Sequence, residues 1–165
     1  MCFAMDRKTC FFIGHRDAPE EIRQRLLAVV ERHITDYGVT EFVVGRYGRF
    51  DAEAAAAVRA AKKDHPAVEL VLLLPYYPVT GADHIEQDYD ATFFPPGMET
   101  VPKSLAIVRA NEYMIRNSQF LICYNTGSVG NTRRLVEYAA AREQKGLIQI
   151  ENMAANKYCS ISNSP

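Results

Sequence analysis

Two short segments of the chain combine glycine with side chains suited to anions. One runs from Gly45 to Asp51 (GRYGRFD) and the other from Asn125 to Thr132 (NTGSVGNT). Each precedes a helical pattern, and the free N–H groups and positive dipole end of a helix N-terminus attract anions. A third turn, Gly14-His15-Arg16, adds a guanidinium group that binds phosphate or carboxylate in a bidentate manner. Together these turns predict a site for a nucleotide or a sugar phosphate.

The predicted ligand-binding residues lie in these turns and on one later helix. They are Gly14, His15, Arg16, Gly45, Arg46, Gly48, Asp51, Asn111, Asn125, Gly127, Gly130, Asn131 and Thr132. Neither glycine-containing turn fits the GxGxxG or GxxxxGK[ST] pattern, so no common NAD site or ATPase loop is indicated. Glycine also closes ordinary turns between a strand and a helix, so each turn alone has a purely structural alternative.

The sequence shows no pattern typical of a metal site or of a reactive cysteine. The four cysteines and four histidines form no CxxC or HExxH pattern, and we expect no metal and no cofactor. Cys10 and Cys123 stand in apolar runs, where a free cysteine usually serves as a small buried hydrophobe.

The predicted ligand-binding residues stand in a chain that alternates apolar runs with helical patterns. Strands are predicted over 9–14, 41–45, 69–74, 119–124 and 147–150, each apolar enough to be buried on both faces. Helices are predicted from Asp17, as N-cap, to Gly38, and over 52–63, 103–117 and 132–145. This order predicts an α/β fold: a single Rossmann-like domain of about five parallel strands with helices on both faces. Ligands of such sheets bind beyond the carboxyl ends of the strands, where the three turns lie.

The segment from Tyr76 to Pro102 interrupts the alternation. It holds four of the eight prolines and several aromatic residues. We interpret it as an active-site lid or a binding loop, with a partly disordered surface loop as the alternative. The domain is expected to cover 1–152, followed by a frayed tail over 153–165.

The composition of the chain disfavours two classes of partner, nucleic acid and membrane. The 165 residues (18.6 kDa) carry 19 Lys and Arg against 20 Asp and Glu, a net charge of -1. This balance disfavours nucleic acid as the main partner, because phosphate contacts draw on excess basic residues. No apolar run approaches the ~20 residues that span a bilayer. With no signal-peptide pattern at the start, we expect a cytoplasmic protein without a membrane partner.

Four segments also carry a family resemblance: TCFFIGHR, FVVGRYGRFDAEAAAAV, TFFPPGMETVPKSLAIVRANEYMI and GNTRRLVEYA. Together they resemble the SLOG (SMF/DprA–LOG) superfamily, in particular its small YpsA-like bacterial members, from about Thr9 to Asn152. The resemblance implies a Rossmann-like sheet with a nucleotide-derived ligand over the glycine turns. Relatives include LOG phosphoribohydrolases, DprA-type single-strand DNA binders and nucleotide-sensing domains. It also implies a homodimer, since superfamily members often pair through helices beside the site.

The resemblance to LOG enzymes nominates two catalytic residues. Arg109 matches the position of their arginine, and Glu137 is the acid nearest to their catalytic glutamate. The matching position itself is Leu135, two residues earlier, and two residues on a helix are about 200° of rotation. Arg46 also replaces a glycine of the family's earlier turn. These departures weaken the enzyme interpretation more than the binding interpretation.

The leading prediction is therefore binding of a nucleotide or nucleotide-derived phosphorylated ligand, for sensing or for catalysis. The enzyme alternative is LOG-like cleavage of the N-glycosidic bond of a nucleoside 5'-monophosphate, with Arg109 and Glu137 as catalytic residues. Single-strand nucleic-acid binding is the third possibility, and the charge balance disfavours it.

Overall fold

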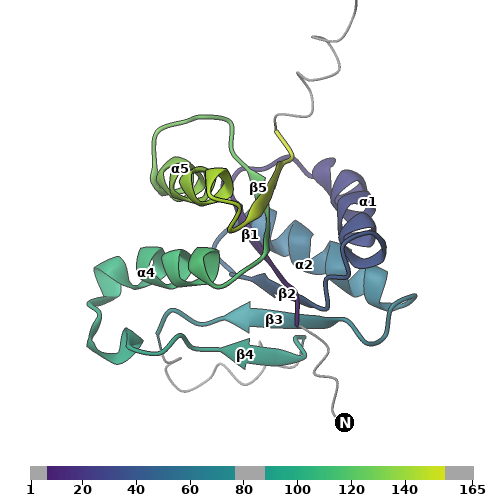
Figure 1. The fold of residues 1–165 in the computed structure, drawn as a ribbon, viewed down its shortest axis with the longest axis horizontal. Coiled ribbons are helices and arrows are strands. Elements are labelled where there is room, and N and C mark those ends of the chain that lie inside the picture. Colours follow the sequence, from purple (N-terminus) through teal and green to yellow (C-terminus); the bar gives the residue numbers. More distant parts are fainter. Residues whose placement is uncertain (1–6, 77–87, 155–165) are drawn as a thin grey trace, which may run out of the picture.

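A computed structural model describes residues 7–76 and 88–154, which form a parallel sheet with helices around it (Figure 1). The strands are β1 (Thr9–Gly14), β2 (Glu41–Val44), β3 (Glu69–Leu73), β4 (Ala91–Phe93), β5 (Phe120–Tyr124) and β6 (Gln149–Asn152). The helices are α1 (Ile22–Thr35), α2 (Arg49–Lys62), α4 (Lys103–Arg116) and α5 (Asn131–Gln144), with a short 3-10 helix η1 (Met98–Thr100). The six strands are all parallel, in the order β4-β3-β2-β1-β5-β6. The Rossmann-like α/β class is confirmed.

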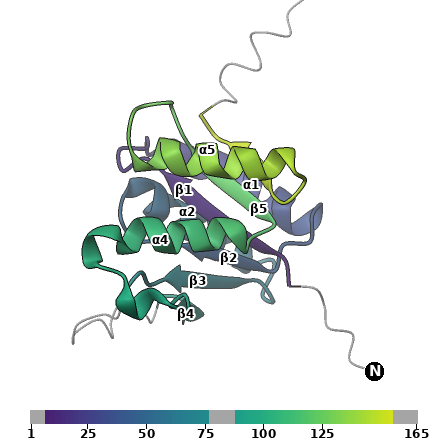
Figure 2. The same cartoon turned by 60° about the vertical axis from the view of Figure 1, so that its left-hand side comes forward.

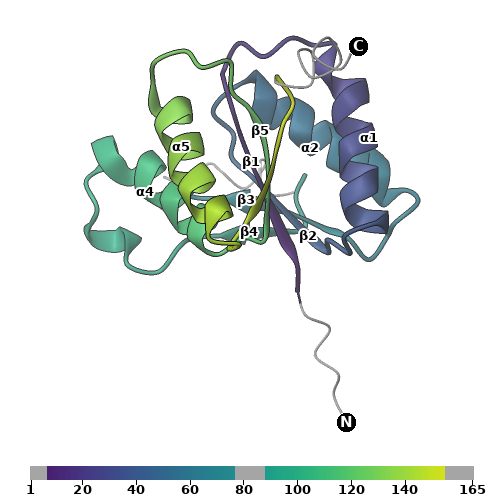
Figure 3. The same cartoon turned by 45° about the horizontal axis from the view of Figure 1, so that its top comes forward.

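Helices cover both faces of the sheet, as the sequence predicts. Figure 3 shows α1 and α2 on one side and α4 and α5 on the other. Alternate residues of β1 serve the two cores: Cys10 and Phe12 pack on the first side, and Phe11 and Ile13 on the second. Both sets are buried, which explains why all residues from Cys10 to Ile13 are apolar instead of every second one.

The sheet has one strand more than the five expected. β4 lies inside the segment interpreted as a lid or binding loop, and Leu74 N–H donates to the Phe93 carbonyl (2.8 Å). This strand has three residues and stands at the edge of the sheet, where only Phe93 is partly buried. Such a strand lacks the apolar run by which the others are recognised. Residues 77–87 of the segment lie outside the described residues.

The first helix begins four residues later than predicted. Its N-terminus is at Ile22, after Glu21 as N-cap, and Asp17 lies in the preceding turn. The reason is Pro19, whose ring disfavours the helical conformation at Ala18. The chain instead tightens through a short-range bond from Ile22 N–H to the Pro19 carbonyl (3.2 Å) and only then becomes helical.

The expected tail is partly integrated into the fold. Met153 is fully buried, and its N–H donates to the Cys123 carbonyl (2.7 Å). Residues 155–165 lie outside the described residues, so the predicted frayed tail beyond Ala154 stays a prediction. None of the helices within 7–76 and 88–154 is long and apolar enough to cross a bilayer.

The strand order places a ligand crevice at the centre of the sheet. From β1 the chain moves outward through β2 and β3 to β4, and then returns to place β5 on the other side of β1. Figure 2 shows α4 and α5 lying over this central region from the same side. Open parallel sheets bind ligands at such a reversal, beyond the carboxyl ends of the strands.

Candidate functional site

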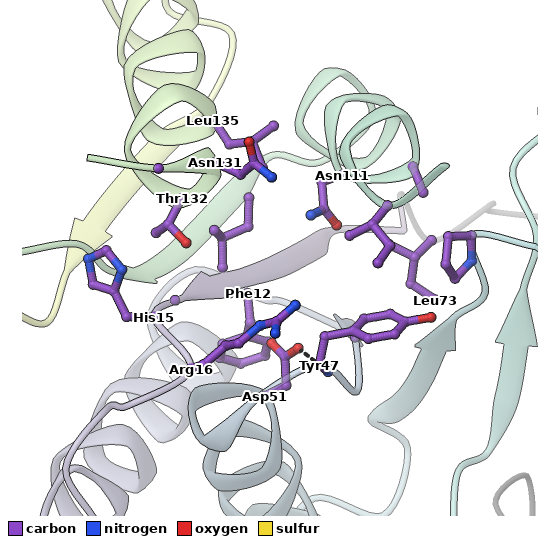
Figure 4. A pocket seen from close by; sticks show the side chains of 17 residues that line it. Phe12, His15, Arg16, Tyr47, Asp51, Leu73, Asn111, Asn131, Thr132 and Leu135 are labelled. Carbon is purple, nitrogen blue, oxygen red and sulfur yellow. Dashed lines mark hydrogen bonds between the residues drawn. The ribbon is translucent and has the colours of Figure 1, made fainter. Parts of the chain in front are cut away.

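A cavity of ≈ 360 Å³ lies at the carboxyl ends of β1 and β2, beneath α4 and α5 (Figure 4). Nine of the thirteen predicted ligand-binding residues line it: Gly14, His15, Arg16, Gly45, Asp51, Asn111, Gly130, Asn131 and Thr132. The other four, Arg46, Gly48, Asn125 and Gly127, do not. The structure thus brings together the turns after β1 and β2, the start of α5 and the middle of α4.

The N-terminus of α5 opens onto the cavity through Gly130, Asn131 and Thr132. The first N–H groups of a helix have no partner within the helix. Among the described residues no side chain caps this end, and the first turn of α5 contains no acidic residue. Gly130 has a φ of 151°, a conformation that glycine adopts readily and that side chains disfavour. This end of the cavity is suited to an anion.

The turn between β5 and α5 is fixed from two sides. The side chain of Asn152 accepts a hydrogen bond from Asn125 N–H and donates one to the Asn125 carbonyl, both at 3.1 Å. His15 Nε2 accepts the N–H of Thr126 (3.1 Å). Asn125 therefore holds the turn in position through β6 and does not line the cavity itself.

Gly14 and Gly48, two of the glycines predicted to bind phosphate, allow close packing. A Cβ on Gly48 would lie 2.7 Å from Arg16 Cα, and one on Gly14 would overlap the Phe50 ring. Arg49 N–H donates to the Arg16 carbonyl (3.1 Å), which joins the turns after β1 and β2. Close approach of these turns carries the Arg16 side chain over the cavity (Figure 4).

Asp51 is the only carboxylate among the described residues that line the cavity. It lies in the first turn of α2, is partly buried, and its Oδ2 accepts the N–H of Tyr47 (3.0 Å). Burial raises the pKa of Asp51 to about 6, against the smaller opposing effect of the Tyr47 hydrogen bond. A carboxyl group with such a pKa exchanges its proton close to neutral pH.

The opposite end of the cavity is apolar. Tyr47 and Leu73 lie at this end (Figure 4), and Pro75 and Ile107 also line the cavity. The Tyr47 hydroxyl lies 3.3 Å from that of Tyr76, and burial together with this contact raises the pKa of Tyr47 to about 12. The sequence analysis missed these four residues, although Tyr47 stands inside GRYGRFD and Pro75 directly follows a predicted strand.

Arg109 and Glu137 lie outside the cavity. Arg109 is 61% exposed at its side chain and pairs with Glu112 (3.9 Å), while Glu137 is 62% exposed and pairs with Arg133 (2.9 Å). The helical periodicity explains both positions. Asn111 and Leu135 line the cavity, and a residue two positions away on a helix points to nearly the opposite side.

Among the described residues, the potential metal ligands are dispersed and the two cysteines are buried. In residues 7–76 and 88–154, no three His, Cys, Asp or Glu side chains are grouped to hold a metal ion. Cys10 and Cys123 are buried as expected, and burial raises the pKa of both thiols, that of Cys123 to about 12.

Comparison with known proteins gives a sequence relative. No protein-family model matches the chain. It is similar to an uncharacterised SPbeta prophage-derived protein, YoqJ, from Bacillus subtilis (strain 168). The two are 27% identical over 140 residues, covering 72% of this chain and 80% of YoqJ.

Solved structures of other proteins share the fold. DNA processing protein A (DprA) from Streptococcus pneumoniae matches 96% of this chain with a TM-score of 0.60 and 9% identity; the chain spans 62% of the length of that protein. The molybdenum cofactor binding protein from Rippkaea orientalis matches with a TM-score of 0.54 and 13% identity, over 96% of this chain and 98% of the other. At these identities the likeness is one of fold.

Proposed function

We propose that this chain, which has the fold of the SLOG superfamily as its sequence predicts, binds a nucleotide or nucleotide-derived phosphorylated ligand. The observation that carries the proposal is the α5 N-terminus, which faces the cavity with no side-chain cap among the described residues and no acid in its first turn. A phosphate there would accept hydrogen bonds from the first N–H groups of α5 and interact favourably with the helix dipole. Arg16, across the cavity, supplies a guanidinium group for the same anion.

The cavity favours a small molecule over a nucleic-acid strand. A volume of ≈ 360 Å³ falls in the range of small-molecule sites. Single-strand binders use long basic grooves and show strong salt dependence, whereas this chain has a net charge of -1. A shared fold with DprA therefore supports nucleic-acid binding less than the cavity supports a nucleotide.

Hydrolysis of the N-glycosidic bond has weaker support. Arg109 and Glu137 are exposed and paired with neighbours on their own helices, outside the cavity. A group that acts on a bound ligand must lie within hydrogen-bonding reach of it, directly or through one water molecule. Binding without turnover is accordingly the function that we propose.

Thermal unfolding against a panel of ligands tests this proposal. The panel holds nucleoside mono-, di- and triphosphates, cyclic nucleotides, ribose 5-phosphate and the molybdenum cofactor named for the Rippkaea protein. A ligand at 100 times its Kd adds about 2.7 kcal/mol, which raises the Tm by roughly 5–10 °C for a domain of this size. A selective shift, with the compound recovered unchanged, is expected. If none of the compounds shifts the Tm while an oligonucleotide does, nucleotide binding is wrong and nucleic-acid binding replaces it.

A further inference from the structure

A second cavity, of ≈ 340 Å³, lies at the opposite edge of the sheet from the first. The first residue of each of four neighbouring strands lines it: Thr9, Glu41, Glu69 and Ala91. The C-terminal end of α4 contributes to the same cavity. Its volume falls in the range of small-molecule sites.

Two carboxylates lie side by side in this cavity, and only one of them is neutralised. Glu41 and Glu69 are register partners on β2 and β3. Glu41 pairs with Arg7 (3.1 Å) and accepts a hydrogen bond from the Thr9 hydroxyl (3.1 Å). The Glu69 side chain has no hydrogen bond or ion pair to any residue in 7–76 and 88–154. Because like charges on neighbouring strands repel, the cavity carries an uncompensated negative charge at Glu69.

The end of α4 adds to this negative potential. The C-terminus of a helix is the negative end of its dipole. Asn117, the C-cap of α4, lines the cavity, and its Nδ2 donates to the Tyr113 carbonyl (2.8 Å). Its Oδ1 is an acceptor without a donor among the described residues. Arg116, the basic residue of the last turn, is exposed and does not line the cavity. This wall therefore favours a cation, as Glu69 does.

The remaining walls of the second cavity are apolar and aromatic. Val43 and Val71 are buried in the core on the α4 side of the sheet and line the cavity from β2 and β3. Phe93 and Tyr113 also line it, with ring centroids 5.7 Å apart. Aromatic rings attract cations through their faces as well as apolar groups. A matching ligand thus combines a positive group with an apolar part.

We propose that the second cavity binds a small primary ammonium compound, whose positive group pairs with Glu69 and whose apolar part lies against Val43 and Val71. An ammonium group supplies hydrogen-bond donors only, which suits a site whose unpartnered groups are acceptors. Charge complementarity selects it over an alcohol of the same shape, which lacks the charge, and over an anion, which Glu69 repels. This site goes beyond the proposed function, since it lies at the other edge of the sheet and takes a ligand of opposite charge.

Titration followed by the backbone amide signals in proton–nitrogen NMR tests the proposal, because it locates even weak binding. The probes are phenethylamine and hexylamine, each compared with the alcohol of the same skeleton, phenethyl alcohol or hexanol. The amines are expected to shift the amide signals of Glu41, Glu69 and Asn117 and to leave that of Thr132, in the first cavity, unchanged. They should bind at least about fivefold more tightly than the alcohols, the ratio that an exposed ion pair of about 1 kcal/mol produces.

Glu69→Gln removes the charge and keeps the shape of the side chain. In this variant the ratio of amine to alcohol affinity is expected to fall to near one. Glu99→Gln, which removes an exposed carboxylate outside both cavities, is the matched control and should keep the wild-type ratio. A salt series on wild type keeps the proposal testable if Glu69→Gln fails to fold: added NaCl should weaken binding of the amines and leave that of the alcohols unchanged.

Several results would overturn the proposal. They are equal affinity of wild type for amines and alcohols, an unchanged ratio in a folded Glu69→Gln protein, and amine-induced shifts only around the first cavity. Absence of any shift with either amine overturns it as well. If the signals around Glu69 move with protein concentration alone, a second copy of the chain covers the cavity and the proposal is wrong. None of these results bears on nucleotide binding, which the thermal unfolding panel tests separately.

Discussion

At the scale of single residues, Asp51 has two opposing effects on the stability of the fold. It holds the turn after β2 through Tyr47 N–H, and it lies in a cavity where burial raises its pKa to about 6. An acid whose pKa is higher in the folded than in the unfolded protein destabilises the fold once it ionises. This cost is absent below the unfolded-state pKa of about 4, grows as the pH rises to 6, and stays constant above that.

Asp51→Asn is therefore expected to stabilise the unliganded protein at pH 8, by at most about 3 kcal/mol, and to do so less at pH 5. The amide oxygen can still accept the Tyr47 N–H. Urea unfolding at both pH values, with Asp17→Asn as the matched control, measures the difference. A variant less stable than wild type at pH 8 would show that the charge of Asp51 is compensated in the folded protein.

Gly48 gives a second prediction at this scale. Its backbone is extended (φ 166°), which any residue adopts, so only the space for a side chain limits it. A methyl group there would lie 2.7 Å from Arg16 Cα, a backbone atom that cannot swing aside. Gly48→Ala is expected to lower the free energy of unfolding by about 1–3 kcal/mol through overpacking.

Gly146→Ala serves as the comparison, because it meets open space but has a φ of 73°. Its cost is about 1 kcal/mol, from backbone strain alone. No loss of stability in Gly48→Ala, against a loss in Gly146→Ala, would mean that the turns after β1 and β2 can separate without penalty. Urea unfolding of the two variants side by side decides between these results.

At the scale of elements, a negative charge at the N-terminus of α5 is expected to raise the stability of the fold and to lower its affinity for an anionic ligand. Asn131 lies in its first turn and lines the cavity. Asn131→Asp changes the shape little but places a negative charge at the positive end of the helix. The variant is expected to gain about 0.3–1 kcal/mol of stability and to lose tenfold or more in affinity for a nucleoside 5'-monophosphate, because the carboxylate occupies the anion site.

Thermal unfolding and calorimetric titration of Asn131→Asp measure the two effects. Asn117→Asp, at the C-terminal end of α4 and outside the cavity, is the control: it should slightly weaken the fold and leave nucleotide affinity unchanged. Undiminished affinity in Asn131→Asp would place the phosphate elsewhere in the cavity.

The elements also show how far sequence reasoning reaches. Strands such as β1 and β5 can be recognised in the sequence because both of their faces are buried, so nearly every residue in them is apolar. β4 was not predicted, because an edge strand of three residues has no such pattern. The polar cavity residues Asn131 and Thr132 follow from chain order, since turns after parallel strands meet at one edge. Leu73 and Ile107 were not predictable, because an apolar side chain in a cavity wall has the same sequence signature as one in the core.

At the scale of the whole molecule, the layered sheet predicts a gradient of local stability. β1 lies between β2 and β5 and is buried on both faces, whereas β4 is an exposed edge strand. Amide hydrogens that open only with global unfolding belong to such central strands. Hydrogen exchange measured by mass spectrometry is expected to be slowest in β1 and β5 and fastest, among the strands, in β4. Faster exchange in β1 than in β4 would contradict this arrangement.

A homodimer, which the family resemblance implies, stays a prediction at this scale. Analytical ultracentrifugation over a range of concentrations measures the mass in solution directly. A single species of 18.6 kDa at every concentration would refute it.

The central position of β1 has a consequence for how the protein is made. Its neighbour on one side, β5, lies about 110 residues further along the chain, with Phe11 paired to Leu121. When the chain has left the ribosome through α4, the strands β4-β3-β2-β1 are present, and β1, which is central in the finished sheet, is an open edge. Open edges of this kind pair with other strands. The edge is covered only when β5 (Phe120–Tyr124) has been synthesised. The two hydrogen bonds between Asn152 and Asn125 can form only after about 30 further residues. The binding cavity is thus completed only after α5 and β6 have left the ribosome, and a nascent chain stalled between these points is expected to bind chaperones.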